Sequence, residues 1–407
     1  MTLLTDALLR DLPKTDLHLH LDGSLRPETL LELADAQGVK LPARSVKGLF
    51  SKVFKDSYAN LSEYLQGFAY TCAVMRDAAS IERIAFELCE DNFAEGVRYL
   101  EMRFAPQLHT GGSLKTVQEV LEAVTRGIQK AEKKWNHKPA VRNGSEPAYR
   151  AGIIVCAMRF FLAPFSPTYA SMFEAFGQLP AENLYGLASV ALVRASIDAR
   201  DSLGLPVVGV DLAGAERGFP AKTHQPAFQL AHDAFLGKTV HAGEDYGPES
   251  IFQALTDLHC DRIGHGTWLF HANHVHDPSI LDAKAYVENL VQYVADRRVT
   301  LEVCLTSNLQ TIPKLKTLKN HPFKRMLEER LSATLCTDNR LVSRTTMTRE
   351  YRLAVDEFDL TATQLSDLLV YGFKRSFFPG RYSEKRAYVR QVLDYRDSVF
   401  AKHGVKN

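Results

Sequence analysis

The six cysteines of this chain are scattered, and no two of them stand in a C-x-x-C spacing. The absence of that spacing excludes zinc fingers and the zinc enzymes that bind their ion through a P-C-x-x-C signature. Charge of one sign is not in excess either. The 49 basic and 48 acidic residues give a net charge of +1, which offers no global attraction to nucleic acid or to a membrane surface. We therefore expect neither nucleic acid nor a membrane as a partner. The scattered cysteines are expected to be free thiols in a reducing compartment.

Long apolar runs are also missing. The most apolar window, Ala151–Phe165, is too short to span a membrane and contains Arg159. The first residues lack the basic segment followed by an apolar stretch that marks a secretory signal. These features predict a cytoplasmic protein. With 407 residues, 45% of them hydrophobic, the chain can bury a large core without disulfides.

Short β-rich segments alternate with amphipathic helical patterns along most of the chain. We predict eight strands: Thr15–His20, Arg98–Arg103, Gly152–Ala157, Pro206–Asp211, Lys238–His241, Arg262–His265, Thr300–Leu305 and Ser332–Thr337. The helical patterns include Ser80–Gly96, Thr116–Lys134, Leu184–Leu203, Gln225–Leu236 and Ala283–Arg297. This alternation indicates βαβ units with a parallel sheet, and eight units predict one closed (β/α)8 TIM barrel over residues 1–407.

Three regions fall outside the repeat. Residues 45–76 follow the first strand, include several aromatic side chains and are expected to form a lid over the barrel mouth. Residues 133–150 are polar and contain Asn143-Gly144 and two prolines, which predicts a loop insertion. Residues 347–403 are expected to form extra helices that close the bottom or side of the barrel.

The segment Thr15–Gly23 reads TDLHLHLDG. Alternate residues of a strand share a face, so Asp16, His18 and His20 should point into the barrel and the intervening leucines outward. Two imidazoles at this spacing can reach a single ion. The alternative is a pair of buried, hydrogen-bonded histidines.

Three further strands end in polar residues. His241 ends one strand, with Glu244 just beyond it; His265 stands between two glycines; and Asp338 follows an apolar strand. Enzymes with this barrel place catalysis at those strand ends. Three histidines and a carboxylate suit a borderline cation such as Zn²⁺, whose bound water becomes more acidic. His265 and Glu244 then remain for water orientation and proton transfer.

Six motifs in this order resemble the adenosine deaminase family: LPKTDLHLHLDGSLRPETL near the start, GVDLAGAE at 209–216, HAGE at 241–244, RIGHG at 262–266, TSN at 306–308 and TDN at 337–339. The resemblance implies a barrel of the metal-dependent amidohydrolase type. It also implies hydrolytic deamination of adenosine, and of 2′-deoxyadenosine, to the inosine product and ammonia in purine salvage. One Zn²⁺ per chain would be bound by His18, His20, His241 and Asp338.

The resemblance also implies the remaining roles. Glu244 would protonate the purine N1 as hydroxide attacks C6, and His265 would orient the metal-bound water and help to deprotonate it. Gly214 would offer its backbone N–H to N3, and Asp22 would contact the ribose 5′-hydroxyl. His20 counts among the substrate-contacting residues as well, and Asp338 among the catalytic ones. Glu244 must be protonated to donate, so we expect burial to raise its pKa.

The lid carries a helical pattern of apolar residues at i, i+3, i+4 and i+7: Leu61, Tyr64, Leu65 and Phe68. In the family this face covers the nucleoside, although any amphipathic helix shows the same spacing. Most relatives have a second aspartate after the metal-binding one, where this chain has Asn339 followed by Arg340, a pair that resembles a bacterial branch. An amide can donate to purine N7, which an ionised carboxylate cannot do.

Other candidates receive structural interpretations. His271, His274 and His276 are assigned to a polar loop or a helix start rather than to a second metal site, and His109 and His224 to the surface. Glu101 and Arg103 are expected to pair with each other beneath the site, and Cys304 and Cys336 to be small core residues.

Two alternatives stay open. The first is a deaminase of another 6-aminopurine compound, either adenine or a 5′-substituted adenosine such as aminofutalosine. The second is a non-catalytic barrel that binds nucleosides or a partner protein, although every ligand and proton carrier is present. The sequence gives no indication of the oligomeric state.

Overall fold

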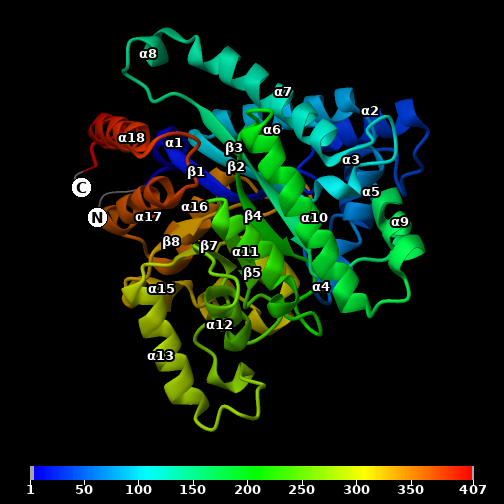
Figure 1. Ribbon diagram of the computed structural model, residues 1–407. Coiled ribbons are helices and arrows are strands. Elements are labelled where there is room, and N and C mark those ends of the chain that lie inside the picture. The colour runs from blue at the N-terminus through cyan, green and yellow to red at the C-terminus, as the bar shows by residue number, and fades with distance from the viewer. Residues whose placement is uncertain (1–3, 406–407) are drawn as a thin grey trace.

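Eight parallel strands follow one another around a barrel in the computed structural model, which describes residues 4–405 (Figure 1). The strands are β1 (Lys14–His20), β2 (Val97–Phe104), β3 (Arg150–Met158), β4 (Val207–Ala213), β5 (Gly237–Ala242), β6 (Arg262–His265), β7 (Thr300–Val303) and β8 (Ala333–Leu335). The ring closes where Leu19 of β1 pairs in parallel with Asp338, just beyond β8. The predicted TIM barrel is confirmed; the ends of the predicted domain, residues 1–3 and 406–407, lie outside the described residues.

Helices cover the outside of this barrel (Figure 1). The α-helices are α1 (Asp6–Asp11), α2 (Pro27–Gln37), α3 (Val46–Lys52), α4 (Leu61–Leu65), α5 (Phe68–Ala73), α6 (Ala78–Ala94), α7 (Val117–Asn136), α8 (Pro139–Arg142), α9 (Pro167–Phe176), α10 (Ala181–Asp201), α11 (Gln225–Asp233), α12 (Pro248–Thr256), α13 (Ala283–Asp296), α14 (Leu305–Thr311), α15 (Phe323–Glu328), α16 (Met347–Phe358), α17 (Ala362–Arg375) and α18 (Tyr382–Lys402). No helix in residues 4–405 is both long and apolar enough to cross a membrane.

The side-chain alternation predicted for β1 is wrong at two positions. The pairing of β1 with β2 shifts register between Asp16 and Leu19, which indicates a bulge there. Leu17 consequently packs with Cys304 and Cys336 rather than with Leu19. Asp16 does not join the histidines either, because its carboxylate accepts hydrogen bonds from the hydroxyl and backbone N–H of Thr337.

The lid and the insertion differ in part from expectation. The lid consists of three short helices, α3, α4 and α5, and its apolar pattern is interrupted at Gln66-Gly67, between α4 and α5. The insertion is partly helical, because α7 continues to Asn136 and α8 follows. The backbone carbonyl groups of Gly144 and Glu146 accept hydrogen bonds from Gln391 of α18, which ties the insertion to the last helix. It does not reach the mouth.

Helices from the C-terminal part of the chain lie against the floor of the barrel. Arg262 donates to the backbone carbonyl of Arg375 at the end of α17, and the hydroxyl of Tyr388 in α18 donates to the carbonyl of Arg98. Lys402 and Asp11 form an ion pair, so the first and last helices lie side by side (Figure 1).

Three expectations about polar residues are wrong. His109 and His224 are fully buried rather than exposed. Glu101 and Arg103 do not pair with each other; Glu101 pairs with Arg262, and Arg103 with Asp211 and Glu302. Glu101 and Arg103 both lie on β2, but their partners come from β4, β6 and β7.

We predict that Arg262→Met destabilises the protein by about 3–5 kcal/mol, because the buried carboxylate of Glu101 would lose its cationic partner and that of Glu302 one of its two. The matched control is Arg390→Met, which removes an exposed i,i+4 pair with Asp394 and should change the free energy of unfolding by less than about 0.5 kcal/mol. Equilibrium unfolding in urea measures both. Equal free energies for the two variants would contradict the prediction.

Candidate active site

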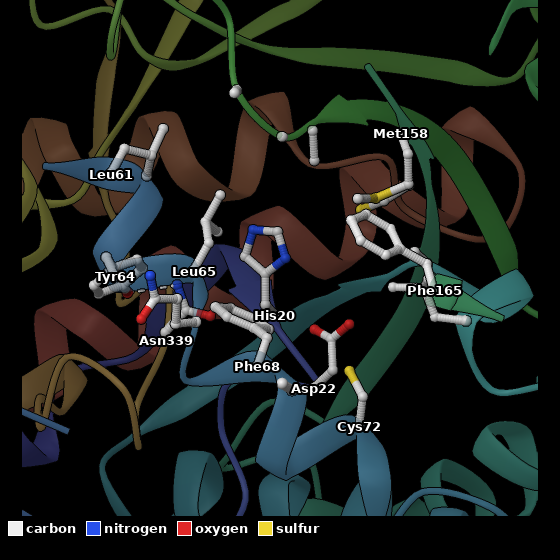
Figure 2. Close-up of a pocket in the computed structure, with 18 of the residues that line it drawn as sticks. His20, Asp22, Leu61, Tyr64, Leu65, Phe68, Cys72, Met158, Phe165 and Asn339 are labelled. Carbon is white, nitrogen blue, oxygen red and sulfur yellow. Dashed lines mark hydrogen bonds between the residues drawn. The ribbon is translucent and has the colours of Figure 1, made fainter. Parts of the chain in front are cut away.

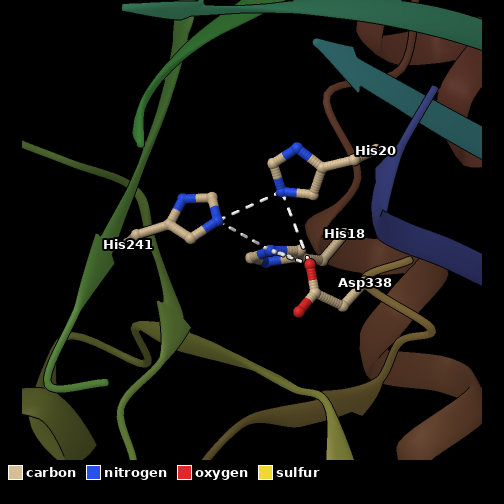
Figure 3. A group of neighbouring side chains, drawn as sticks. All are labelled: His18, His20, His241 and Asp338. Carbon is tan, nitrogen blue, oxygen red and sulfur yellow. Dashed lines mark hydrogen bonds and ion pairs between the residues drawn. The ribbon is translucent and has the colours of Figure 1, made fainter. Parts of the chain in front are cut away.

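Four side chains from three distant parts of the sequence converge at the mouth of the barrel (Figure 3). His18 and His20 lie on β1, His241 on β5 and Asp338 just after β8. Nε2 of His241 lies 3.1 Å from Nε2 of His18 and 3.2 Å from Nε2 of His20. Oδ1 of Asp338 lies 3.6 and 3.5 Å from the same two histidine atoms. The four residues predicted as ligands therefore face one point.

These separations fit a bound ion. Ligand atoms bound at about 2.0–2.1 Å to a tetrahedral zinc ion would be about 3.3 Å apart. Burial lowers the pKa of His18 and His20 well below the usual value, so both rings are neutral and present lone pairs. Burial raises the pKa of Asp338 to about 6, which leaves its carboxylate ionised at neutral pH. Three imidazole nitrogens and one carboxylate form a candidate metal site.

Two buried carboxylates orient the imidazoles. Glu302 of β7 lies 2.9 Å from Nδ1 of His18, and Asp211 of β4 lies 3.0 Å from Nδ1 of His241. Each carboxylate accepts a hydrogen bond from the Nδ1–H group, which leaves Nε2 free to bind a metal. The guanidinium of Arg103 lies 2.8 Å from Glu302 and 3.1 Å from Asp211, and compensates their charge. Glu302 and Asp211 are not recognisable as site residues from the sequence, because no local motif pairs either of them with a histidine.

Backbone geometry turns two of the polar side chains into the mouth. His265 and Asp338 have left-handed φ angles of 65° and 60°. For residues other than glycine this conformation costs roughly 1–2 kcal/mol and collects at functional sites. Gly264 leaves room for the neighbouring ring, because a Cβ there would lie 2.9 Å from Cε1 of His18. The RIGHG motif is thus explained by close packing around the histidine cluster.

A cavity of about 550 Å³ opens beside the four groups. Its walls include every other residue predicted to contact substrate or carry a proton: Asp22, Leu61, Tyr64, Leu65, Phe68, Gly214, Glu244, His265 and Asn339. Figure 2 shows Leu61, Leu65 and Phe68 of the lid on one side, and Met158 and Phe165 across from them. The cavity is largely apolar away from its polar end, as pockets for flat aromatic ligands usually are.

Glu244 and His265 lie side by side at the polar end, with Oε2 of Glu244 3.6 Å from Nε2 of His265. Burial raises the pKa of Glu244 well above its usual value, with a further contribution from the charge of Asp338, and both effects favour the protonated carboxyl group. Burial lowers the pKa of His265. Nδ1 of that ring lies 3.0 Å from the side-chain amide of Asn308, which leaves Nε2 facing the cavity without a hydrogen-bond partner among the described residues.

A second carboxylate, that of Glu216, holds the backbone that carries Glu244. It accepts hydrogen bonds of 2.6–2.9 Å from the backbone N–H groups of residues 243–246 and from the hydroxyl of Ser250. Arg159, 3.9 Å from Glu216, donates to the carbonyl of His241 at 2.7 Å. Glu216 belongs to the GVDLAGAE motif, but its role depends on a loop 28 residues further along the chain.

Asn339 does not present a free N–H to the cavity. Its amide nitrogen lies 2.7 Å from the hydroxyl of Tyr64 and 2.7 Å from Asp338, while its carbonyl oxygen has no partner among the described residues. Gly23 permits this arrangement, because a Cβ there would clash with the Asn339 amide. The lid and the last strand are therefore joined through Tyr64.

The histidines at 271, 274 and 276 take no part in this cluster. His274 stacks on Trp268 at 3.9 Å, and within residues 4–405 none of the three belongs to a group able to hold an ion. Trp268 in turn donates to the backbone carbonyl of Glu244. The prediction of a polar loop in this region is confirmed.

Comparison with known proteins agrees with this geometry. The family profile described as adenosine deaminase matches residues 13–169 and 188–395. The adenosine deaminase of Mycobacteroides abscessus is 34% identical over 385 residues, which cover 94% of each chain. The Arabidopsis N6-mAMP deaminase structure is 26% identical, with a TM-score of 0.72 over 95% of this chain and 99% of that one. A Burkholderia ambifaria amidohydrolase with bound Zn shares the fold, at 19% identity and a TM-score of 0.72 over 99% and 96% of the two chains.

We predict that Asp211→Asn weakens metal binding about 10–100-fold, because the amide supports the Nδ1 proton of His241 less strongly than a carboxylate does. The matched control is Glu249→Gln, a buried carboxylate that accepts only backbone N–H groups of residues 276 and 277 and should leave the affinity unchanged. Competition with a chromophoric chelator measures both. Equal affinities in the two variants would show that Asp211 does not support the ligand.

Proposed function

Because this chain belongs to the adenosine deaminase family, we propose that it hydrolyses adenosine, and 2′-deoxyadenosine, to inosine or 2′-deoxyinosine and ammonia. We further propose Zn²⁺ as the cofactor, one ion per chain, and a cytoplasmic role in purine salvage. The observation that carries the proposal is the meeting of the four ligand groups with Glu244 and His265 at one end of a single cavity.

The ligand set fits the chemistry. A zinc ion held by His18, His20, His241 and Asp338 would lower the pKa of a coordinated water molecule towards neutrality. The side-chain N–H of Asn308 donates to Nδ1 of His265, so the neutral ring carries its proton on Nε2 and would orient the coordinated water by hydrogen bonding. Because His265 would contact the water, Glu244 would be free to interact with the purine ring.

Glu244 would donate its proton to purine N1. Attack at C6 breaks the ring's aromaticity and places electron density on N1, so a donor there acts mainly in the transition state. The raised pKa of Glu244 favours the protonated form that this step requires. Glu216 acts as a positioning residue, because its hydrogen bonds fix the backbone of residues 243–246 and so the direction of the Glu244 side chain.

The cavity walls would recognise the rest of the nucleoside. The backbone N–H of Gly214 would donate a hydrogen bond to N3, and the carboxylate of Asp22 would accept one from the ribose 5′-hydroxyl. The lid residues would exclude water. Asn339 can donate to N7 only after giving up one of its present partners. An entering purine that moves Tyr64 away from Asn339 would free such an N–H, which links recognition of N7 to movement of the lid.

We expect adenosine and 2′-deoxyadenosine to be the best substrates. Adenine lacks the ribose contacts to Asp22, so its kcat/KM should be at least about 100-fold lower. Loss of the adenosine absorbance band measures the rate. More efficient turnover of adenine or of a 5′-substituted adenosine would assign the enzyme to that substrate instead.

Replacement of the proton donor separates chemistry from metal binding. Glu244→Gln should retain one metal ion per chain but lose about 10²–10⁴-fold in kcat, because an amide cannot supply the proton. Asp245→Asn is the matched control: the residue is adjacent, and its side chain does not line the cavity. Near-normal kcat in Glu244→Gln would refute the assigned role.

A further inference from the structure

A second group of potential metal ligands lies on the cavity wall, apart from the first. Asp22 follows β1, Cys72 lies on the lid helix α5, and His109 lies in the turn after β2. Their ligand atoms all lie within 4.8 Å of one another, and the group shares no residue with the histidine cluster. Figure 2 shows the Asp22 carboxylate and the Cys72 sulfur pointing towards each other.

Buried atoms in this group lack partners. His109 is completely buried, and neither of its ring nitrogens has a hydrogen-bond partner among the described residues. Its Nε2 lies 3.8 Å from Oδ2 of Asp22, beyond hydrogen-bond range, and Oδ1 of Asp22 is also unpartnered. Such groups are rare in folded proteins and point to a missing ligand, water or ion. A ribose 5′-hydroxyl at Asp22 would leave the imidazole and the thiol unused.

The chemistry of the group suits a zinc-class ion. One imidazole, one thiol and one carboxylate provide nitrogen, sulfur and oxygen donors of the kinds that Zn²⁺ and Co²⁺ accept. Burial raises the pKa of Cys72, so the sulfur is a neutral thiol before an ion arrives. Binding would form a metal–sulfur bond and release the thiol proton to solvent. Three protein ligands would leave a fourth position for water.

We propose that Asp22, Cys72 and His109 form a second site, which binds a divalent ion of the zinc class and inhibits the enzyme. The ion would occupy the carboxylate that the proposed function assigns to the ribose 5′-hydroxyl. It would also tie the lid helix α5 to the end of β1. Inhibition is therefore competitive with the nucleoside. The inhibitory effect rests on the proposed function, whereas the binding site does not.

Cobalt titration tests the binding site directly. Protein carrying one zinc ion per chain is titrated with Co²⁺ while the near-ultraviolet thiolate-to-cobalt charge-transfer band is recorded. The histidine cluster contains no sulfur ligand, so the band reports the second site. We expect one additional ion per chain with the band in the wild-type protein, and the loss of both in Cys72→Ala and in His109→Gln.

Cys304→Ala is the matched control, because Cys304 is the thiol grouped with His265 and Asp338 near the first cluster. This variant should keep the band. Survival of the band in Cys72→Ala, or the absence of a second ion from the wild-type protein, would overturn the proposal.

Inhibition is measured separately, with adenosine as substrate. Excess Zn²⁺ should raise the apparent KM without lowering kcat, and Cys72→Ala should raise the inhibition constant at least about tenfold. A second ion that leaves turnover unaffected would overturn the inhibitory role. A protein that binds the second ion but deaminates no aminopurine would support the second site and refute the proposed function. An active deaminase that binds no second ion would support the proposed function and refute the second site.

Discussion

Hydrogen bonds from buried carboxylates to imidazole nitrogens hold this site in shape. Glu302 and Asp211 fix the rings of His18 and His241, and the guanidinium of Arg103 lies between the two carboxylates and compensates their charge. Arg262 also binds Glu302 at 2.6 Å, and it continues the network to the floor of the barrel. The geometry of the histidine cluster at the mouth and the stability of the barrel floor therefore depend on the same network of buried arginines and carboxylates.

Two buried residues at the mouth of the barrel have strained backbone conformations. His265 and Asp338 adopt left-handed backbone conformations, which aim their side chains into the cavity instead of along the sheet. The surroundings hold both in place: Asn308 contacts the first, and Ser307 lies 2.5 Å from the second. A different device holds the loop that carries Glu244, where one buried carboxylate collects several backbone N–H groups. Rigid support of this kind keeps a donor aligned with a developing charge.

Much of the architecture could be predicted from local pattern. The predicted strand ends lie within about two residues of the observed ones. The polar residues at those ends share one cavity because the C-terminal ends of parallel strands in a closed barrel surround one mouth. The errors concern contacts between distant segments. The surface assignment of His109 failed because its neighbours come from the lid and from β1, and the outward placement of Leu17 failed because a bulge interrupts the alternation.

The sequence by itself determined where the strands lie, which polar side chains stand at their ends and which family the motifs resemble. These are properties of residues that are neighbours in the chain. Only the tertiary structure decided which polar and charged side chains pair with each other. The Nδ1 of His18 binds a carboxylate 284 positions away, and the amide of Asn339 binds a hydroxyl 275 positions away. No local pattern encodes such pairs, because they form only when the barrel closes, which brings β1 near β7 and the lid near the end of β8.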